Sequence, residues 1–247
     1  MRAAEGEAWI IDRAPFDDAL RALAARRGAR SIVVDELLGV ERSGGGWRVA
    51  IRTGARRVVF ADALVDASGR SRVLARRLGI PVRRGARLVA SWGQTRLADR
   101  DERVHVMDDR DGWWLRVGAP QRPRVAIAHF APRALTSVAL SNLAPPEFGR
   151  VRVPRVHVAP AHESRLARFA GPGWLAVGDA AMTFDPLASH GLVSALGGAI
   201  YAAIAIRAAV TGELTALDSY RLLLEERWCA YRSTLAARYA YSRFRER

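Results

Sequence analysis

Residues 173–192 constrain the fold of this chain more than any other stretch of the sequence. They predict a short apolar strand over residues 174–177 that ends in Gly178-Asp179, then a loop containing proline and glycine, then a long apolar helix. A strand that runs through a glycine turn into a helix is typical of parallel α/β sheets. An ordinary strand-to-helix turn with a capping aspartate gives the same pattern, so the residues alone leave the role of Asp179 open.

This segment has the chemistry of a cofactor site. Asp179, at the end of a strand, can accept hydrogen bonds from sugar or ribityl hydroxyls, and Gly178 and Gly191 allow a ligand close to the backbone. The helix that follows directs free N–H groups and its positive dipole end at the loop, where they would stabilise an anionic ring system such as a reduced flavin. His190 in that loop is a candidate proton donor, although a structural role explains it equally well.

A second candidate site lies at residues 63–70, Ala-Leu-Val-Asp-Ala-Ser-Gly-Arg. The pattern predicts an apolar strand that ends at Asp66 and runs into a helix over residues 71–78. Gly69 and the first amides of that helix form a possible anion site, with Arg70 and Arg72 nearby. Taken alone, this octapeptide is equally compatible with a surface turn.

The remaining pattern predicts an α/β protein with a β-rich second part. Further helices are expected over residues 15–27, 133–143, 192–210 and 216–245, and further strands over 31–34, 37–41, 47–52, 56–60, 88–95, 103–108, 113–117, 124–130 and 152–158.

Composition narrows the class of protein. The net charge is +14, and every one of the 39 basic residues is an arginine. Because the arginines are spread along the chain, a compositional bias explains them better than nucleic-acid binding. The polar start over residues 1–7 is unlike a signal peptide, and the 192–210 helix is short and rich in Gly and Ala, so a buried helix is favoured over a membrane span. With Cys229 as the one cysteine, we expect a cytoplasmic protein, and no metal site is expected.

Both candidate sites resemble motifs of the superfamily of FAD-dependent monooxygenases (aromatic-hydroxylase type), flavin-dependent halogenases and geranylgeranyl-reductase-like enzymes. The resemblance implies that Asp179, with Gly178, holds the ribityl chain of FAD, that Pro186 lies close to the isoalloxazine ring, and that the backbone of Gly191 and Leu192 faces its pyrimidine edge.

The same resemblance extends to two earlier segments. Residues 63–70 are similar to the middle motif of the superfamily, in which Asp66 and Gly69, beside Arg70, approach the pyrophosphate of FAD and, during reduction, the nicotinamide cofactor. Residues 13–20 resemble the Arg-x-x-Phe-Asp-x-x-Leu start of a helix, from which Arg13 would reach FAD.

The chain departs from the superfamily at its start. The superfamily opens with a strand, Gly-x-Gly-x-x-Gly, a helix and a strand, and this chain has no such run. We expect that about a hundred residues carrying this unit are absent before Met1, through a fragment, a misplaced start codon or a split gene. The expected fold class is α/β: an incomplete FAD-binding Rossmann-like domain with an inserted antiparallel β-sheet substrate domain and C-terminal helices. Residues 1–86 would form a partial FAD-binding domain with a β meander, 87–160 the substrate domain, and 161–247 the return to the FAD-binding domain with the C-terminal helices.

The implied function is an FAD-dependent oxidoreductase, most specifically an NAD(P)H-using monooxygenase that hydroxylates through a flavin hydroperoxide. A halogenase or a reductase on the same scaffold, and an inactive fragment or a subunit completed by a partner, remain alternatives. The substrate would be a small molecule or a protein side chain, because residues 220–245 resemble the tails of flavoproteins that modify protein side chains during quinone-cofactor maturation. Trp92, Trp113 and His129 are candidate substrate residues on the second sheet, although core packing also explains them.

Overall fold

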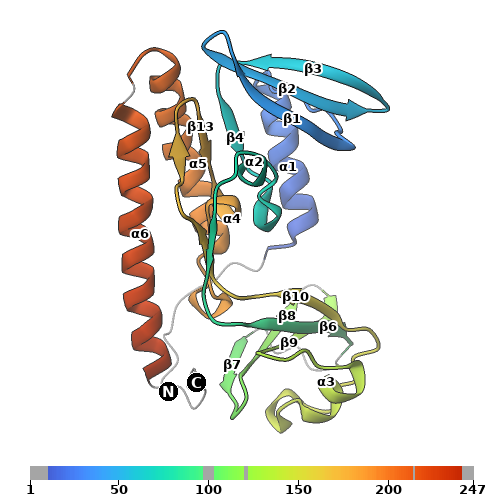
Figure 1. Cartoon of the computed structure of the whole chain (residues 1–247). Helices are drawn as coiled ribbons and strands as arrows, with labels where there is room; N and C mark the ends of the chain where they lie inside the picture. Colours follow the sequence, from blue (N-terminus) through green and yellow to red (C-terminus); the bar gives the residue numbers. More distant parts are fainter. Residues whose placement is uncertain (1–10, 97–102, 120–121, 214, 241–247) are drawn as a thin grey trace.

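The computed structural model describes residues 11–96, 103–119, 122–213 and 215–240 (Figure 1). Residues 1–7 and the predicted helical residues 241–245 lie outside these ranges. The helices are α1 (Arg13–Arg26), η1 (Gly69–Ser71), α2 (Val73–Arg77), α3 (Ser137–Leu143), η2 (Pro146–Phe148), α4 (Gly178–Ala181), η3 (Pro186–Ala188), α5 (Gly191–Val210) and α6 (Thr215–Ala240). The strands are β1 (Glu36–Ser43), β2 (Gly46–Thr53), β3 (Ala55–Ala61), β4 (Leu64–Asp66), β5 (Val82–Arg84), β6 (Val89–Thr95), β7 (Val104–Asp108), β8 (Trp113–Ala119), β9 (Arg122–Ala131), β10 (His157–Pro160), β11 (Ser164–Leu166), β12 (Ala170–Gly171), β13 (Trp174–Ala176) and β14 (Met182–Thr183).

A small sheet of order β12-β13-β4 forms the centre of the upper half of the molecule in Figure 1. β13 and β4 are parallel, with Ala176 opposite Asp66, so the two predicted motifs begin side by side. All three residues of β13 are buried, and α5 and α6 pack around them. The parallel strands predicted from the two motifs are therefore confirmed.

The lower half is an antiparallel sheet of order β10-β6-β9-β8-β7. Side chains alternate between two cores. Trp113 and Phe130 lie in one core with Leu187 of η3 packed against it, while Trp114 and Ile127 lie in the other core with residues of α3 and η2. The predicted second sheet is confirmed.

A two-stranded ribbon joins the halves. Gly85 N donates to Glu163 O at 3.0 Å, Ala161 N donates to Leu88 O at 2.9 Å, and β5 pairs with β11 in a third sheet of order β14-β11-β5. These strands were not predicted, because two or three residues are too few to show a hydrophobic period.

Three predicted elements need correction. Residues 31–34 are not a strand: pairing starts only at Asp35 N, which donates to Arg52 O, and Val33 is 86% exposed. The predicted strand 152–158 begins only at His157, after Pro154, which has no N–H to donate. α5, predicted to be buried, buries only three small residues, and it is the one helix of the described chain long and apolar enough to cross a membrane. The meander β1–β2–β3 is confirmed.

Candidate functional site

The turn after β4 is organised by the carboxylate of Asp66, which is 2% exposed. Its Oδ1 accepts from Ser68 N at 3.0 Å and its Oδ2 accepts from Ala75 N at 2.8 Å. Gly69 follows at φ +65°, a left-handed conformation that glycine adopts without strain. Asp66 therefore shapes the turn around Gly69, and both of its oxygens are engaged within the protein.

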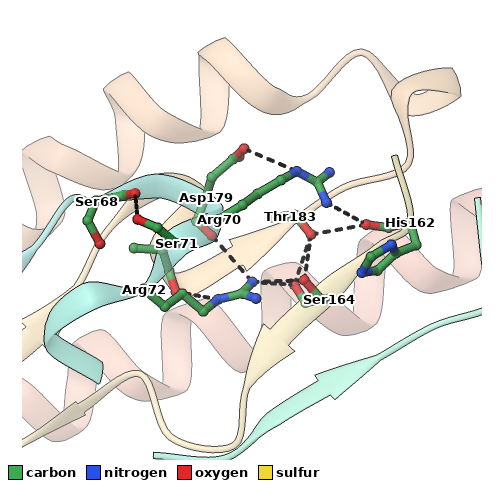
Figure 2. Close-up of polar contacts among 9 residues, drawn as sticks. Ser68, Arg70, Ser71, Arg72, His162, Ser164, Asp179 and Thr183 are labelled. Atoms are coloured by element: carbon green, nitrogen blue, oxygen red, sulfur yellow. Dashed lines mark hydrogen bonds and ion pairs between the residues drawn. The ribbon is translucent and has the colours of Figure 1, made fainter. Parts of the chain in front are cut away.

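The turn after β13 lies beside it and presents a carboxylate to solvent. Gly178 has φ +54°, and a Cβ there would come within 3.3 Å of Ala195 Cβ, so glycine lets α4 approach α5. The Asp179 side chain is 43% exposed, and its Oδ2 lies 3.9 Å from Arg70 Nε (Figure 2). Arg70 also donates to His162 O at 2.9 Å, which fixes the guanidinium beside the free carboxylate.

A second arginine, Arg72, ties the two turns together (Figure 2). It is buried, with Nε donating to Ala180 O at 3.0 Å and Nη2 donating to Ser164 Oγ at 2.8 Å. The Ser164 hydroxyl also lies 2.8 Å from Thr183 Oγ1. The sequence predicted that Arg72 lies near a bound anion. In the structure its guanidinium instead forms hydrogen bonds that connect the two motifs.

The site carries a concentrated positive charge. Burial, followed by the nearby Arg70, Arg84 and Arg72, lowers the pKa of His162. Burial also lowers the pKa of Arg72, with Arg70 and Arg84 adding to that effect. The guanidinium groups that repel His⁺ would attract an anionic group of a ligand.

The loop between α4 and α5 is held by α6. Asp185 accepts from Leu187 N at 2.8 Å through Oδ1 and from the Tyr239 hydroxyl at 2.8 Å through Oδ2. The Tyr231 hydroxyl accepts from Asp185 N at 2.8 Å, and Arg238 donates to Leu187 O at 2.7 Å. These α6 residues fix Pro186 in η3, and sequence reasoning missed them because no local pattern links residues about fifty positions apart.

The loop ends at the N-terminus of the 20-residue helix α5. No side chain caps this end: His190 occupies the N-cap position, exposed, without a side-chain hydrogen bond to the helix. Its ring lies 5.9 Å from that of Phe184 and 6.4 Å from that of Tyr231. The amides of Gly191 and Leu192 thus begin a helix whose positive end faces the loop.

The structure places two of the three predicted substrate residues, Trp92 and Trp113, on one face of the five-stranded sheet and His129 on the other. Trp113 is 1% exposed and stacks on Phe130, on the sheet face that meets η3. Trp92 is 37% exposed and stacks on His157. His129 lies on the opposite face, with its ring centroid 4.4 Å from that of Trp114 at an interplanar angle of 37°, because the two residues pair across β8 and β9.

The remaining predicted cofactor residue, Arg13, lies at the start of α1 and forms an ion pair with Asp17 at 3.3 Å. α1 buries none of its residues, and among the described contacts no hydrogen bond or ion pair joins Arg13 to Arg70 or Asp179. Within the described residues, no group of three or more His, Cys, Asp or Glu side chains could hold a metal ion.

The residues present fit part of FAD. An exposed carboxylate suits the ribityl hydroxyls, the glycine turns leave the backbone accessible, and the uncapped end of α5 suits a ring system that becomes anionic on reduction. The fit is to the ribityl and flavin half of the cofactor.

Known proteins resemble the chain in sequence and in fold. No protein-family model matches it. It is 26% identical over 224 residues to the "Putative FAD-dependent oxidoreductase LodB" of Marinomonas mediterranea. The alignment covers 83% of this chain and 61% of that protein. This chain therefore spans less than two thirds of the length of that relative.

Solved structures share the fold. The flavin-dependent brominase Bmp2 matches with a TM-score of 0.76 and 21% identity, over 87% of this chain and 60% of Bmp2. BrvH, a flavin-dependent halogenase from Brevundimonas sp. BAL3, matches with a TM-score of 0.77 and 18% identity, over 94% and 48%. The peptidyl tryptophan dihydroxylase QhpG matches with a TM-score of 0.68 and 22% identity, over 87% and 52%. The sequence is thus similar to that of a protein named as an FAD-dependent oxidoreductase, and the fold is that of solved flavin-dependent halogenases.

Proposed function

We propose that the chain forms the ribityl- and flavin-binding part of an FAD-dependent oxidoreductase that works as an NAD(P)H-using monooxygenase. One observation carries the proposal: the exposed carboxylate of Asp179 stands next to Arg70 at the point where two parallel strands end side by side. A crevice beyond the carboxyl ends of parallel strands is the usual ligand position in α/β sheets.

Each group has a simple part in this proposal. Asp179 accepts hydrogen bonds from ribityl hydroxyls, and Arg70 orients that carboxylate. The amides at the start of α5 hold negative charge on the ring, and His190 is positioned as the proton donor of the loop. Bound FAD would supply the redox chemistry, accepting hydride from NAD(P)H and activating oxygen.

The apolar sheet face above η3 suits a reaction that must exclude water. Leu88, Trp113 and Phe130 form a buried cluster there, with Leu187 packed against it. A dry environment protects reactive intermediates from hydrolysis. A small molecule or a protein side chain fits this proposal as substrate, and the fold likeness to a peptidyl tryptophan dihydroxylase supports the second class.

Halogenation is the second candidate function, favoured by the fold likeness to a brominase and to a halogenase at TM-scores of 0.76 and 0.77. We place either reaction in the cytoplasm, because Cys229 is exposed and unpaired.

A further unit completes the site in this proposal. β4 is the edge strand of its sheet, Val65 is 47% exposed, and α5 presents an apolar face to solvent, made of Val193, Leu196, Ile200, Tyr201 and Ile204. An unpaired parallel strand with an exposed apolar helix beside it is unusual in a finished α/β sheet. A dinucleotide-binding strand–helix–strand unit would cover both surfaces and bind the adenosine half of FAD.

Flavin binding tests the proposal directly. Protein purified after FAD incubation should show a flavin absorption spectrum, and Asp179→Ala should weaken flavin retention by about tenfold or more, the size expected for a lost charge-assisted hydrogen bond. Asp218→Ala, at an exposed aspartate of α6, is the matched control. Equal retention by both variants would overturn the assignment of Asp179.

A second assay separates the two reactions. Flavin reduction by NADPH or NADH without oxygen, followed by oxygen incorporation into a product, supports the monooxygenase. Bromide-dependent bromination of an added phenol would support the halogenase instead.

A further inference from the structure

A hollow of about 430 Å³ lies on the ribbon that joins the two halves of the molecule. Arg84, Gly85, Arg87, Leu88 and Val89 line it from one side, and Val158, Ala159, Pro160 and His162 line it from the other. Its volume is within the range of small-molecule sites, roughly 300–1,000 Å³. The hollow borders the turns of Asp66 and Asp179 at His162, whose carbonyl oxygen accepts from Arg70, and its other lining residues belong to the ribbon.

The walls of the hollow combine two kinds of surface. Leu88, Val89, Val158 and Pro160 provide hydrocarbon, and Arg84, Arg87 and His162 provide cationic or donor groups. Within the part of the chain that the structure describes, no carboxylate forms an ion pair with Arg84 or Arg87. Burial lowers the pKa of His162, and repulsion by Arg70, Arg84 and Arg72 adds to this effect, so three guanidinium groups lie near this wall.

We propose that this hollow binds an apolar ligand that ends in a carboxylate or phosphate group. The guanidinium of Arg84 takes the anionic group, because arginine presents paired N–H donors that match carboxylate and phosphate oxygens. The hydrocarbon part of the ligand lies along Val158 and Pro160, where its burial adds to affinity. This proposal does not depend on flavin binding.

The geometry supplies a matched control. Arg83 and Arg84 are neighbours in β5, and successive side chains of a strand point to opposite faces. Arg84 lines the hollow and Arg83 does not, although both are exposed. Replacing either one by glutamine removes one positive charge from the same strand.

The test is calorimetric titration of the whole chain, without flavin, with naphthalene-2-carboxylate, 2-naphthyl phosphate and the neutral 2-naphthylmethanol. At least one anion should bind more tightly than the alcohol, and Arg84→Gln should weaken that binding about tenfold, whereas Arg83→Gln should leave it unchanged. Whichever of the two anions binds more tightly identifies the preferred group as carboxylate or phosphate.

The position of binding is checked by NMR of the five histidines. The bound anion should shift the ring resonances of His162 and leave those of His105, in β7, in place. Equal binding of the alcohol, no binding of either anion, equal losses in the two arginine variants, or shifts at His105 alone would each overturn the proposal. Flavin absorption is a separate readout, so failure here and failure of the flavin site are distinguishable.

Discussion

Arg72 donates a hydrogen bond of 3.0 Å to the backbone carbonyl oxygen of Ala180, and so joins the turn after β4 to the helix after β13, 108 residues away in the chain. Its guanidinium also reaches the Ser164 hydroxyl at 2.8 Å. The spacing between the two candidate cofactor turns is thus fixed by one buried side chain.

Removing that side chain should destabilise the fold. Arg72→Met removes the donor to the Ala180 carbonyl and leaves the Ser164 hydroxyl with Thr183 alone, which we expect to lower the free energy of unfolding by about 3 kcal/mol. Arg76→Met, at an exposed position of α2, should change it by less than about 0.5 kcal/mol. Urea denaturation followed by circular dichroism measures both, and equal midpoints would refute the role of Arg72.

The contact between α6 and the cofactor loop should also be measurable. Tyr231→Phe removes the hydroxyl that accepts from the buried Asp185 N, and an unsatisfied buried amide costs about 1–3 kcal/mol. We expect lower stability and faster proteolysis around residues 185–190. Tyr201→Phe is the control, because Tyr201 lies exposed on α5. The same proteolysis pattern in both variants would contradict the contact.

His129 should make stability depend on pH. Burial lowers its pKa, with Asp109 and Asp111 partly opposing the shift. The folded state therefore binds this proton less readily than the unfolded state, and stability should fall as the pH drops below the ordinary histidine value of about 6.5.

His129→Phe keeps a ring on Trp114 and removes the titration. Thermal melts of this variant between pH 7.5 and pH 5 should show a smaller loss of stability than those of the unchanged chain. An unchanged pH slope would mean that other groups cause the loss.

The apolar face of α5 should promote self-association when nothing covers it. Ile200 and Ile204 are each 63% exposed, and apolar patches of this kind mark interaction surfaces. In sedimentation velocity over a concentration series, Ile200→Ser with Ile204→Ser should shift the chain toward monomer. Leu222→Ser, at an exposed position of α6, should have little effect, and a chain that is monomeric throughout would contradict this expectation.

The sequence was most informative where the pattern is local. Glycine turns at residues 43–46 and 53–54 predicted the meander, and strand-like runs divided by Asp, Gly and Pro turns predicted the strands over residues 113–117 and 124–130 of the larger sheet. The two motifs predicted β4 and β13 as strands of a parallel sheet, and the structure pairs them directly.

Contacts between residues far apart in the chain could not be predicted from the sequence. Arg72 reads as an anion contact until Ser164 and Ala180 are placed around it, and Tyr239 has no sequence signal that connects it to Asp185. Residues 31–34 have the composition of a strand, but a strand also needs a partner with free hydrogen-bonding groups, which no sequence window shows. His129 was a candidate substrate residue because its residue type, and not its face of the sheet, can be seen in the sequence.

The two-stranded ribbon that joins the halves of the molecule affects how such a protein can evolve. Val89 and Pro160, where the five-stranded sheet begins and ends, lie opposite each other in the ladder between β6 and β10 (Figure 1). An insertion whose two ends are adjacent can be exchanged for another of different length or shape without moving the strands outside it. Selection could therefore replace the surface of this five-stranded sheet while the turns around Asp66 and Asp179 stay as they are.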